Sequence, residues 1–210
     1  MTRLTGRLRF HPLTAERWPD LEKLFGPRGA YGGCWCMYWR LTRAEFARRQ
    51  GESNRRALKR IVDSGRVPGI LAYAGAEPVG WCSVAPREEY ASLERSPVLG
   101  RLDDEPVWSI VCFYIARSHR KLGVAEALIE AAVAYVRRCG GRIVEAYPTA
   151  PRGRVLAPVS SYQGVPAMFE RLGFQECARP SDARVIMRYF IGTRGRERGR
   201  GRTPARRDNA

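Results

Sequence analysis

The 210-residue sequence lacks any long uninterrupted hydrophobic run. Its longest apolar stretches, Val107–Ala116 and Val124–Val136, contain Ser or Glu and are shorter than the roughly 20 residues that span a bilayer. The N-terminus is polar and rich in Arg, and it has no apolar segment of the kind found in secretory signals. We therefore expect a soluble, cytoplasmic protein with no membrane association.

Patterns for metal binding and disulfide bonding are also missing. Only two histidines occur, His11 and His119, and the six cysteines include no CxxC pair. Cys34-Trp35-Cys36 is the one close pair, but no second pair or paired His follows it, so we expect no metal site. A chain that is 44% hydrophobic can build a core without disulfides, and we expect reduced, mostly buried thiols.

Positive charge is what the sequence has in excess, with 37 Lys and Arg against 21 Asp and Glu and a net charge of +16. Residues 192–210 contribute +5 of it in an Arg/Gly-rich run that cannot bury apolar surface. We expect a single domain over residues 1–191 and a disordered basic tail over 192–210. The excess predicts attraction to nucleic acid or to a phosphorylated cofactor. Because no nucleic-acid-binding motif accompanies it, we expect at most weak nucleic-acid contact through the tail.

Hydrophobic periodicity predicts strands and helices around one sheet. The expected strands are Leu8–Leu13, Ile70–Ala74, Pro78–Val84, Val107–Ala116, Arg142–Tyr147, Gly173–Cys177 and Arg184–Phe190. The expected helices are Thr14–Phe25, Thr42–Gln50, Ser53–Ser64, Arg120–Arg138 and Val165–Leu172, with Thr42 and Ser53 as N-caps. This order predicts a mixed α/β fold with a strand–helix–strand unit at its centre.

A candidate phosphate site lies between the buried strand Val107–Ala116 and the helix after it. The backbone N–H groups of a helix's first turn have no intrahelical partners and carry partial positive charge. Gly123 removes the side chain that would keep a diphosphate away, and Arg120 and Lys121 add formal charge. The segment matches neither GxxxxGK[ST] nor GxGxxG.

At this segment the chain resembles the GNAT superfamily of acetyl-CoA-dependent N-acetyltransferases. Residues 120–125 (RKLGVA) match the family's [QR]xxGx[GA] diphosphate motif, and they lie between a central strand and a helix as that motif does. Residues 79–81 (VGW) and 168–174 (MFERLGF) add to the resemblance, which covers roughly residues 7–190. It implies a central mixed, largely antiparallel sheet of about seven strands, with helices on both faces and splayed central strands.

The resemblance also implies acetyl-CoA as the acyl donor and direct attack by an amine in a ternary complex. The pantetheine arm would lie in a gap between Val107–Ala116 and Arg142–Tyr147. A small-molecule amine or a peptide is the implied acceptor, and exposed strand edges are compatible with a homodimer. The implied cofactor-binding residues are Phe113, Tyr114, Ile115, Arg120, Lys121, Leu122, Gly123, Val124 and Ala125.

Catalytic groups are less clearly marked. Glu145, the only acid in the strand Arg142–Tyr147, is the expected general base, and the alternative is a structural carboxylate paired with an Arg. Glu88, Glu89 and the acidic cluster 103–105 are further candidates for the base. In many family members a helix Tyr protonates the leaving thiolate, but Phe169 occupies its place here. We expect Tyr162 to replace it, with Ser160, Ser161 or water as alternatives.

Aromatic residues are concentrated in the segment that shapes the acceptor pocket in the family. Tyr31, Trp35, Tyr38 and Trp39 are therefore expected to bind the acceptor. The alternative is that Trp35 and Trp39, four residues apart, pack one helical face into the core. Two other functions stay open: a non-catalytic acyl-CoA sensor, suggested by Phe169, and a nucleic-acid-associated protein acting through the Arg/Gly tail.

Overall fold

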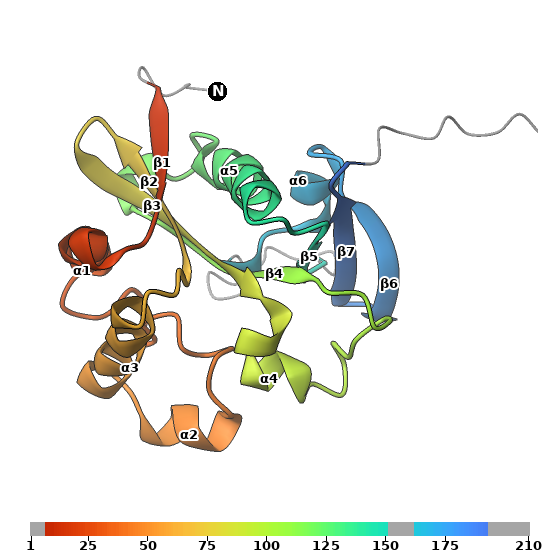
Figure 1. Cartoon of the computed structure of the whole chain (residues 1–210), viewed down its shortest axis with the longest axis horizontal. Coiled ribbons are helices and arrows are strands. Elements are labelled where there is room, and N and C mark those ends of the chain that lie inside the picture. The colour runs from red at the N-terminus through yellow and green to blue at the C-terminus, as the bar shows by residue number, and fades with distance from the viewer. Residues whose placement is uncertain (1–6, 151–161, 193–210) are drawn as a thin grey trace, which may run out of the picture.

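A computed structural model describes residues 7–150 and 162–192. One sheet forms its centre, with seven strands in the order β1-β2-β3-β4-β5-β7-β6 (Figure 1). Only β4 and β5 pair in parallel, because a helix connects them, and every other neighbouring pair is antiparallel. The strands are β1 (Leu8–Pro12), β2 (Gly69–Ala74), β3 (Glu77–Pro86), β4 (Trp108–Ile115), β5 (Ile143–Ala146), β6 (Gln175–Ser181) and β7 (Arg184–Phe190). The predicted mixed, largely antiparallel sheet is confirmed.

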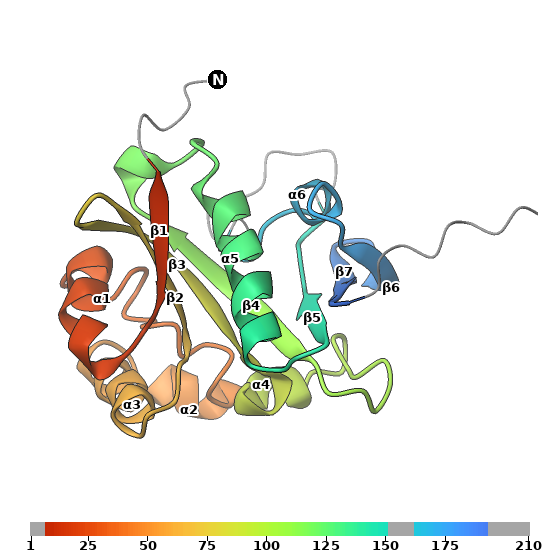
Figure 2. The same ribbon diagram turned by 45° about the horizontal axis from the view of Figure 1, so that its top comes forward.

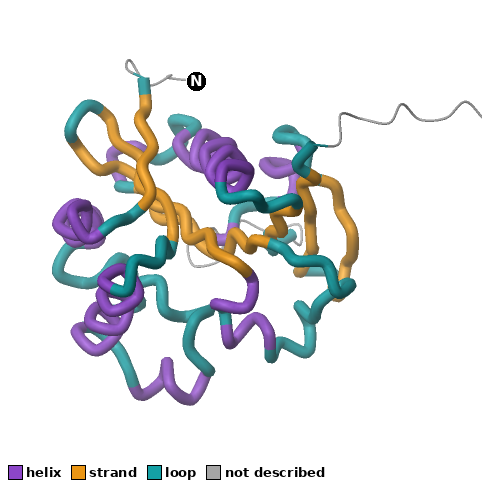
Figure 3. The backbone as a smooth tube through the Cα atoms, viewed as in Figure 1, coloured by secondary structure: helices purple, strands orange, loops and turns teal. Residues whose placement is uncertain are grey.

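Helices cover both faces of this sheet. The α-helices are α1 (Trp18–Phe25), α2 (Arg43–Arg48), α3 (Glu52–Asp63), α4 (Ala91–Glu94), α5 (Val124–Arg138) and α6 (Pro166–Glu170). In the views of Figures 1 and 2, α5 and α6 lie on one side of the sheet and α1 to α3 lie on the other. Figure 3 shows that the connection between α1 and α2 is a long loop.

Strand β2 shows why both faces need cover. Ile70 and Ala72 belong to a core shared with α5, whereas Leu71 and Tyr73 belong to a core shared with α1 and α3. Successive side chains of a strand point to opposite faces, so a strand buried on both sides has an almost continuous apolar sequence. Gly80 on β3 allows α5 to pack closely, because a Cβ there would lie 2.9 Å from Cγ1 of Val124.

Three helix starts differ from the sequence-based expectation. The helix expected from Thr14 becomes α-helical only at Trp18, after a 3₁₀ turn at Ala15–Arg17. Thr42 does cap α2: its hydroxyl accepts from the Glu45 N–H at 3.2 Å, and the Glu45 carboxylate accepts from the Thr42 N–H at 2.9 Å. The N-cap predicted at Ser53 is wrong, because Gly51 occupies that position before α3. The helix expected from Arg120 begins only at Val124, after a 3₁₀ turn at Arg117–His119.

The central strands separate along their length. Strands β4 and β5 pair at three positions, from Trp108 with Val144 to Ile110 with Ala146. Strand β5 ends there, while β4 continues to Ile115. In the described part of the chain, residues 111–115 therefore have no strand beside them on that edge, which confirms the expected splay (Figure 2).

The remaining expectations concern membrane association and two segments that the structure does not describe. No helix among the described residues is long and apolar enough to cross a membrane. The basic tail expected over 192–210 lies outside them except for Gly192, and so do Ser160 and Ser161.

Candidate functional site

The loop that leads into α5 is open to solvent where a phosphate would bind. Gly123 is the N-cap of this 15-residue helix, and it is exposed with a left-handed φ of 82°. A Cβ at Gly123 would meet no heavy atom within 4 Å, so no protein atom blocks the approach of a ligand to this residue from that side. Lys121 is also left-handed, with φ 63°. Exposed amides at a helix N-terminus bind anions, so these residues fit a diphosphate.

The other motif residues anchor this loop to the sheet. Val124 is buried in the core beneath α5, and Leu122 and Ala125 are half-buried. Arg120 and Lys121 are exposed, and the Arg120 Nε donates to the Ile115 carbonyl at 3.1 Å. The loop is thus tied to the end of β4, and its two cations stay in solvent.

The free edge of β4 presents backbone groups beside this loop. The Ala116 N–H donates to the Val79 carbonyl on β3 at 2.9 Å. Backbone groups along an antiparallel strand alternate in direction, so the amides of Tyr114 and Cys112 also face β3. The N–H groups of Phe113 and Ile115 consequently face the gap left where β5 has ended. They are positioned to pair with an extended ligand chain.

A cavity of about 520 Å³ lies along β4. Its volume falls in the range of roughly 300–1,000 Å³ that is usual for small-molecule sites. Its walls come from the loop between α1 and α2, from α2, from β4, from the segment before α6 and from the start of β7. The aromatic side chains in its wall are Phe25, Tyr31, Tyr38, Trp39, Phe46, Phe113, Tyr114 and Tyr162.

The polar groups of the cavity are few. Besides the hydroxyls of the lining tyrosines, they are the amides of Gln50 and Gln163, the Arg184 guanidinium and the thiols of three cysteines, Cys34, Cys36 and Cys112. No carboxylate of the described residues lines the cavity. The described residues therefore give it one formal positive charge and no negative side chain to attract a cation.

Three of the four expected acceptor residues line this cavity: Tyr31, Tyr38 and Trp39. Trp35 does not. It is 5% exposed, stacks on Trp18 with ring centroids 6.0 Å apart, and contacts Phe25 at 5.6 Å. Trp35 thus packs in the core, as the alternative interpretation had it, whereas Trp39 lines the cavity. The reason is local, because Trp35 adopts φ 44° inside a series of turns and not on a helical face.

Tyr162 lies in the cavity wall, with its ring 5.9 Å from that of Tyr31. Burial raises the pKa of the Tyr162 phenol, so the hydroxyl keeps its proton at neutral pH. Phe169 is fully buried between Phe113 and Phe174, with ring centroids 6.2 Å and 5.1 Å away. Of these two positions, only Tyr162 carries a proton that can reach the cavity.

Glu145 is buried and does not line the cavity. Its Oε1 accepts from Arg87 Nη1 at 2.8 Å and from the Tyr147 hydroxyl at 2.5 Å. Its Oε2 accepts from Arg188 Nε at 2.7 Å. Both oxygens are occupied and the side chain is 1% exposed. These contacts favour the structural alternative, a carboxylate paired with Arg, over the role of general base.

Three of the other candidate bases also pair with arginines and do not line the cavity. Glu88 pairs with Arg101 at 2.8 Å, and Glu89 pairs with Arg40 at 2.7 Å. In the acidic cluster 103–105, Asp103 pairs with Arg188 at 2.6 Å.

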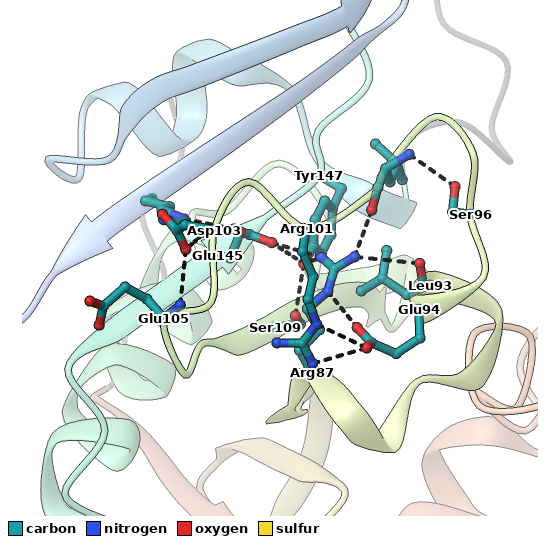
Figure 4. Close-up of polar contacts among 12 residues, drawn as sticks. Arg87, Leu93, Glu94, Ser96, Arg101, Asp103, Glu105, Ser109, Glu145 and Tyr147 are labelled. Carbon is teal, nitrogen blue, oxygen red and sulfur yellow. Dashed lines mark hydrogen bonds and ion pairs between the residues drawn. The ribbon is translucent and has the colours of Figure 1, made fainter.

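Sequence reasoning missed Arg87, the fully buried centre of the network in Figure 4. Its Nε donates to Glu94 at 2.6 Å and its Nη2 donates to the Leu99 carbonyl at 2.6 Å, in addition to its bond with Glu145. Nothing local distinguishes Arg87 from the exposed arginines, because its partners come from α4, from the loop after it and from β5. No sequence signal could have identified it.

The six thiols were predicted to be reduced and mostly buried. All six cysteines are free, but the predicted burial is wrong for most of them, since only Cys36 and Cys82 are buried and Cys139 and Cys177 are exposed. The Trp81 Nε1 donates to Cys36 Sγ at 3.1 Å. A hydrogen bond with Cys112 lowers the pKa of Cys36, whereas burial raises the pKa of Cys34 to about 11. Among the described residues, no group of three or more His, Cys, Asp or Glu side chains could hold a metal ion.

Comparisons with known proteins agree with this geometry. The model of the acetyltransferase (GNAT) family matches residues 34–157, which is more than half of the chain. No curated protein matched the sequence.

Solved structures share the fold at low sequence identity. A GNAT-family acetyltransferase from Desulfovibrio desulfuricans is 17% identical, with a TM-score of 0.51 over 88% of this chain and 99% of that one. One from Listeria monocytogenes is 10% identical, with a TM-score of 0.55 over 91% and 99%. The PaiA N-acetyltransferase from Thermoplasma acidophilum, solved in complex with coenzyme A, is 13% identical, with a TM-score of 0.50 over 88% and 99%. At these identities the likeness shows the fold alone.

Proposed function

The chain belongs to the acetyltransferase (GNAT) family, and on that premise we propose that it transfers the acetyl group of acetyl-CoA to an amine by direct attack in a ternary complex. One observation carries the proposal: the anion-binding loop at Gly123 and the aromatic cavity adjoin the same unpaired edge of β4. A donor with a diphosphate at one end and a thioester at the other could bridge the two.

In this proposal the backbone amides around Gly123, with Arg120 and Lys121, hold the diphosphate of acetyl-CoA. The N–H groups of Phe113 and Ile115 pair with the pantetheine arm, and Tyr114 borders its thioester end. Leu122, Val124 and Ala125 shape the helix start. Amides fixed by the sheet need no reorganisation to stabilise the negative charge that develops on the acetyl oxygen.

The reaction then moves two protons. The amine nitrogen forms a bond to the acetyl carbon, the carbon–sulfur bond breaks, and sulfur leaves with the electron pair. Tyr162 is the proposed donor of a proton to this sulfur, because its side chain lines the cavity and its hydroxyl stays protonated. The nitrogen gives up its proton to water, since no described carboxylate lines the cavity. Glu145 is then a positioning residue that holds β5 against β7.

The test is the release of free thiol from acetyl-CoA in the presence of small amines and short peptides. Thiol release that requires an amine supports the proposal. The Gly123→Glu variant should lose this activity, because its carboxylate would repel the diphosphate. Stabilisation of the fold by acetyl-CoA without turnover of any acceptor would instead support the acyl-CoA sensor that Phe169 suggested.

A further inference from the structure

Among the residues that the structure describes, Arg184 is the one cationic side chain in the wall of the cavity. It is the first residue of β7, and it forms an isolated bridge with Thr149 just after β5. Its Nη1 donates to the Thr149 hydroxyl at 3.3 Å and to the side-chain oxygen of Gln163. Two neutral acceptors on one nitrogen orient the guanidinium and leave its other N–H donors for a ligand.

The charge of Arg184 has no counter-ion among the described residues. The buried arginines Arg40, Arg87 and Arg188 each pair with at least one carboxylate within 3 Å. Arg184 is half-buried and pairs with none of the described carboxylates, and its burial lowers its pKa. Residues 151–161 contain no Asp or Glu that could supply one. A guanidinium partly removed from water without a carboxylate is costly unless a ligand brings the negative charge.

The rest of the cavity favours an apolar, planar ligand body. Tyr38 contacts Trp39 and Phe46 edge-to-face, with ring centroids 5.1 Å and 5.3 Å away. Tyr31 and Tyr38 are 56% and 44% exposed, so neither ring is buried by the protein itself. An aromatic ligand would bury them and gain offset or edge contacts with them. The absence of described carboxylates disfavours polycationic acceptors such as aminoglycosides and polyamines.

We propose that the acceptor is an aromatic α-amino acid or a close analogue, whose carboxylate pairs with Arg184 while its ring lies against Tyr31, Tyr38 and Phe46. Guanidinium and carboxylate match in a bidentate geometry, which fixes orientation as well as charge. The inference rests on the proposed acetyl transfer and adds the substrate class of that site. Arg184 acts in it as a specificity-determining residue.

Matched substrate pairs test this directly. Phenylalanine and phenethylamine differ only in the carboxylate, and so do tryptophan and tryptamine. We expect kcat/KM to favour the amino acid of each pair by roughly 10-fold or more, as is usual for a hydrogen bond to a charged group. The Arg184→Gln variant should lower that ratio toward one, and Arg184→Lys should retain part of it. Arg179→Gln, an exposed arginine of β6 that pairs with Glu176, is the control and should leave the ratio unchanged.

A second measurement separates this inference from the proposed function. Binding of 3-phenylpropionate, which has the ring and the carboxylate but no amine, is followed by calorimetry in the presence of coenzyme A. Binding that Arg184→Gln removes, without acetylation of any amine, would support the carboxylate subsite and overturn the acetyl transfer. Turnover of the amines with no preference for the carboxylate would overturn the subsite and leave the acetyl transfer standing. If the unaltered chain neither binds 3-phenylpropionate nor acetylates the amino acids, the inference is overturned. This outcome does not depend on whether a variant folds, because both tests are first made on the unaltered chain.

Discussion

Arg87 Nη1 lies 2.8 Å from Glu145 Oε1, and each of these side chains is only 1% exposed. Arg87 follows β3 directly, and Glu145 lies on β5. A second arginine, Arg188 on β7, holds the other oxygen of Glu145. Arg87, Glu145 and Arg188 therefore connect β3, β5 and β7. They do so at the end of the sheet where β4 still pairs with β5, and the gap between these two strands begins beyond it.

Loss of Arg87 should destabilise the fold strongly. Arg87→Met removes the buried arginine that pairs with both Glu145 and Glu94, and the loss of one partner of a buried ion pair typically costs about 3–5 kcal/mol. Arg101→Met is the matched control, because Arg101 also pairs with Glu94 but is partly exposed, and such pairs contribute about 0–1 kcal/mol. Urea denaturation of both variants measures the difference. Equal losses would contradict the structural role of Arg87.

Glu145→Gln should lower stability without moving the pH dependence of catalysis. The amide keeps the shape of the side chain but cannot compensate Arg87 and Arg188. Melting temperature and the kcat–pH profile are measured on the same preparation, at a temperature where the variant is folded. A displaced acid limb of the profile would show that Glu145 is the base after all.

Two glycines at opposite ends of α5 allow a controlled test of the diphosphate site. Gly123 and Gly140 have φ values of 82° and 79°, and a Cβ at either would meet no heavy atom within 4 Å. Replacement of either by Glu should cost similar backbone strain, about 1–2 kcal/mol. Acetyl-CoA at about 100 times its Kd should stabilise the unaltered chain by about 2.7 kcal/mol.

We expect Gly140→Glu to keep this ligand-induced stabilisation and Gly123→Glu to lose it. Thermal denaturation with and without acetyl-CoA gives the answer. If both variants respond equally to the ligand, the diphosphate binds elsewhere.

Tyr162→Phe tests the proton donor. Removing a general acid typically lowers kcat by about 10²–10⁴-fold, while stabilisation by acetyl-CoA should persist. Because burial raises the pKa of Tyr162, the unaltered enzyme should not lose the protonated phenol below its ordinary pKa of about 10. Tyr31→Phe, which alters a neighbouring cavity residue, should affect KM more than kcat. An unchanged kcat in Tyr162→Phe would assign the proton to water.

Asp103 should make stability depend on pH in the acid range. Its hydrogen bonds with Arg188 lower the pKa of the Asp103 carboxyl, so the native state favours the ionised form. The stabilisation is therefore present above the unfolded-state pKa of about 4, and it is lost as pH falls through the lower native-state value. Asp103→Asn should lower the melting temperature at pH 7 and have little effect near pH 2, whereas exposed Asp104→Asn should have little effect at either pH. A constant difference across this range would contradict the assignment.

The elements and the diphosphate motif could be predicted because their signals are local. Strand β4 is marked by apolar residues on both faces, α5 by apolar spacings of three and four, and the motif occupies six consecutive positions. Thr42 and Glu45 form a capping box, which is a local sequence signal. The N-cap of α3 is Gly51 and not Ser53, and Gly51 has no side chain that could have signalled this. Family membership follows from this same local information, because the family model matches residues 34–157.

The sequence by itself determined the succession of strands and helices along the chain, the amphipathic faces and the loop at Gly123, since each depends on neighbours along the chain. Only the tertiary structure decided which side chains share the cavity, because Tyr38, Tyr114, Tyr162 and Arg184 come from four separate segments. The tertiary structure also placed Trp35 in the core and paired both carboxylate oxygens of Glu145 with arginines. The identity of a side chain fixes its chemistry, but its burial and its counter-ion depend on segments that meet only when the sheet has formed.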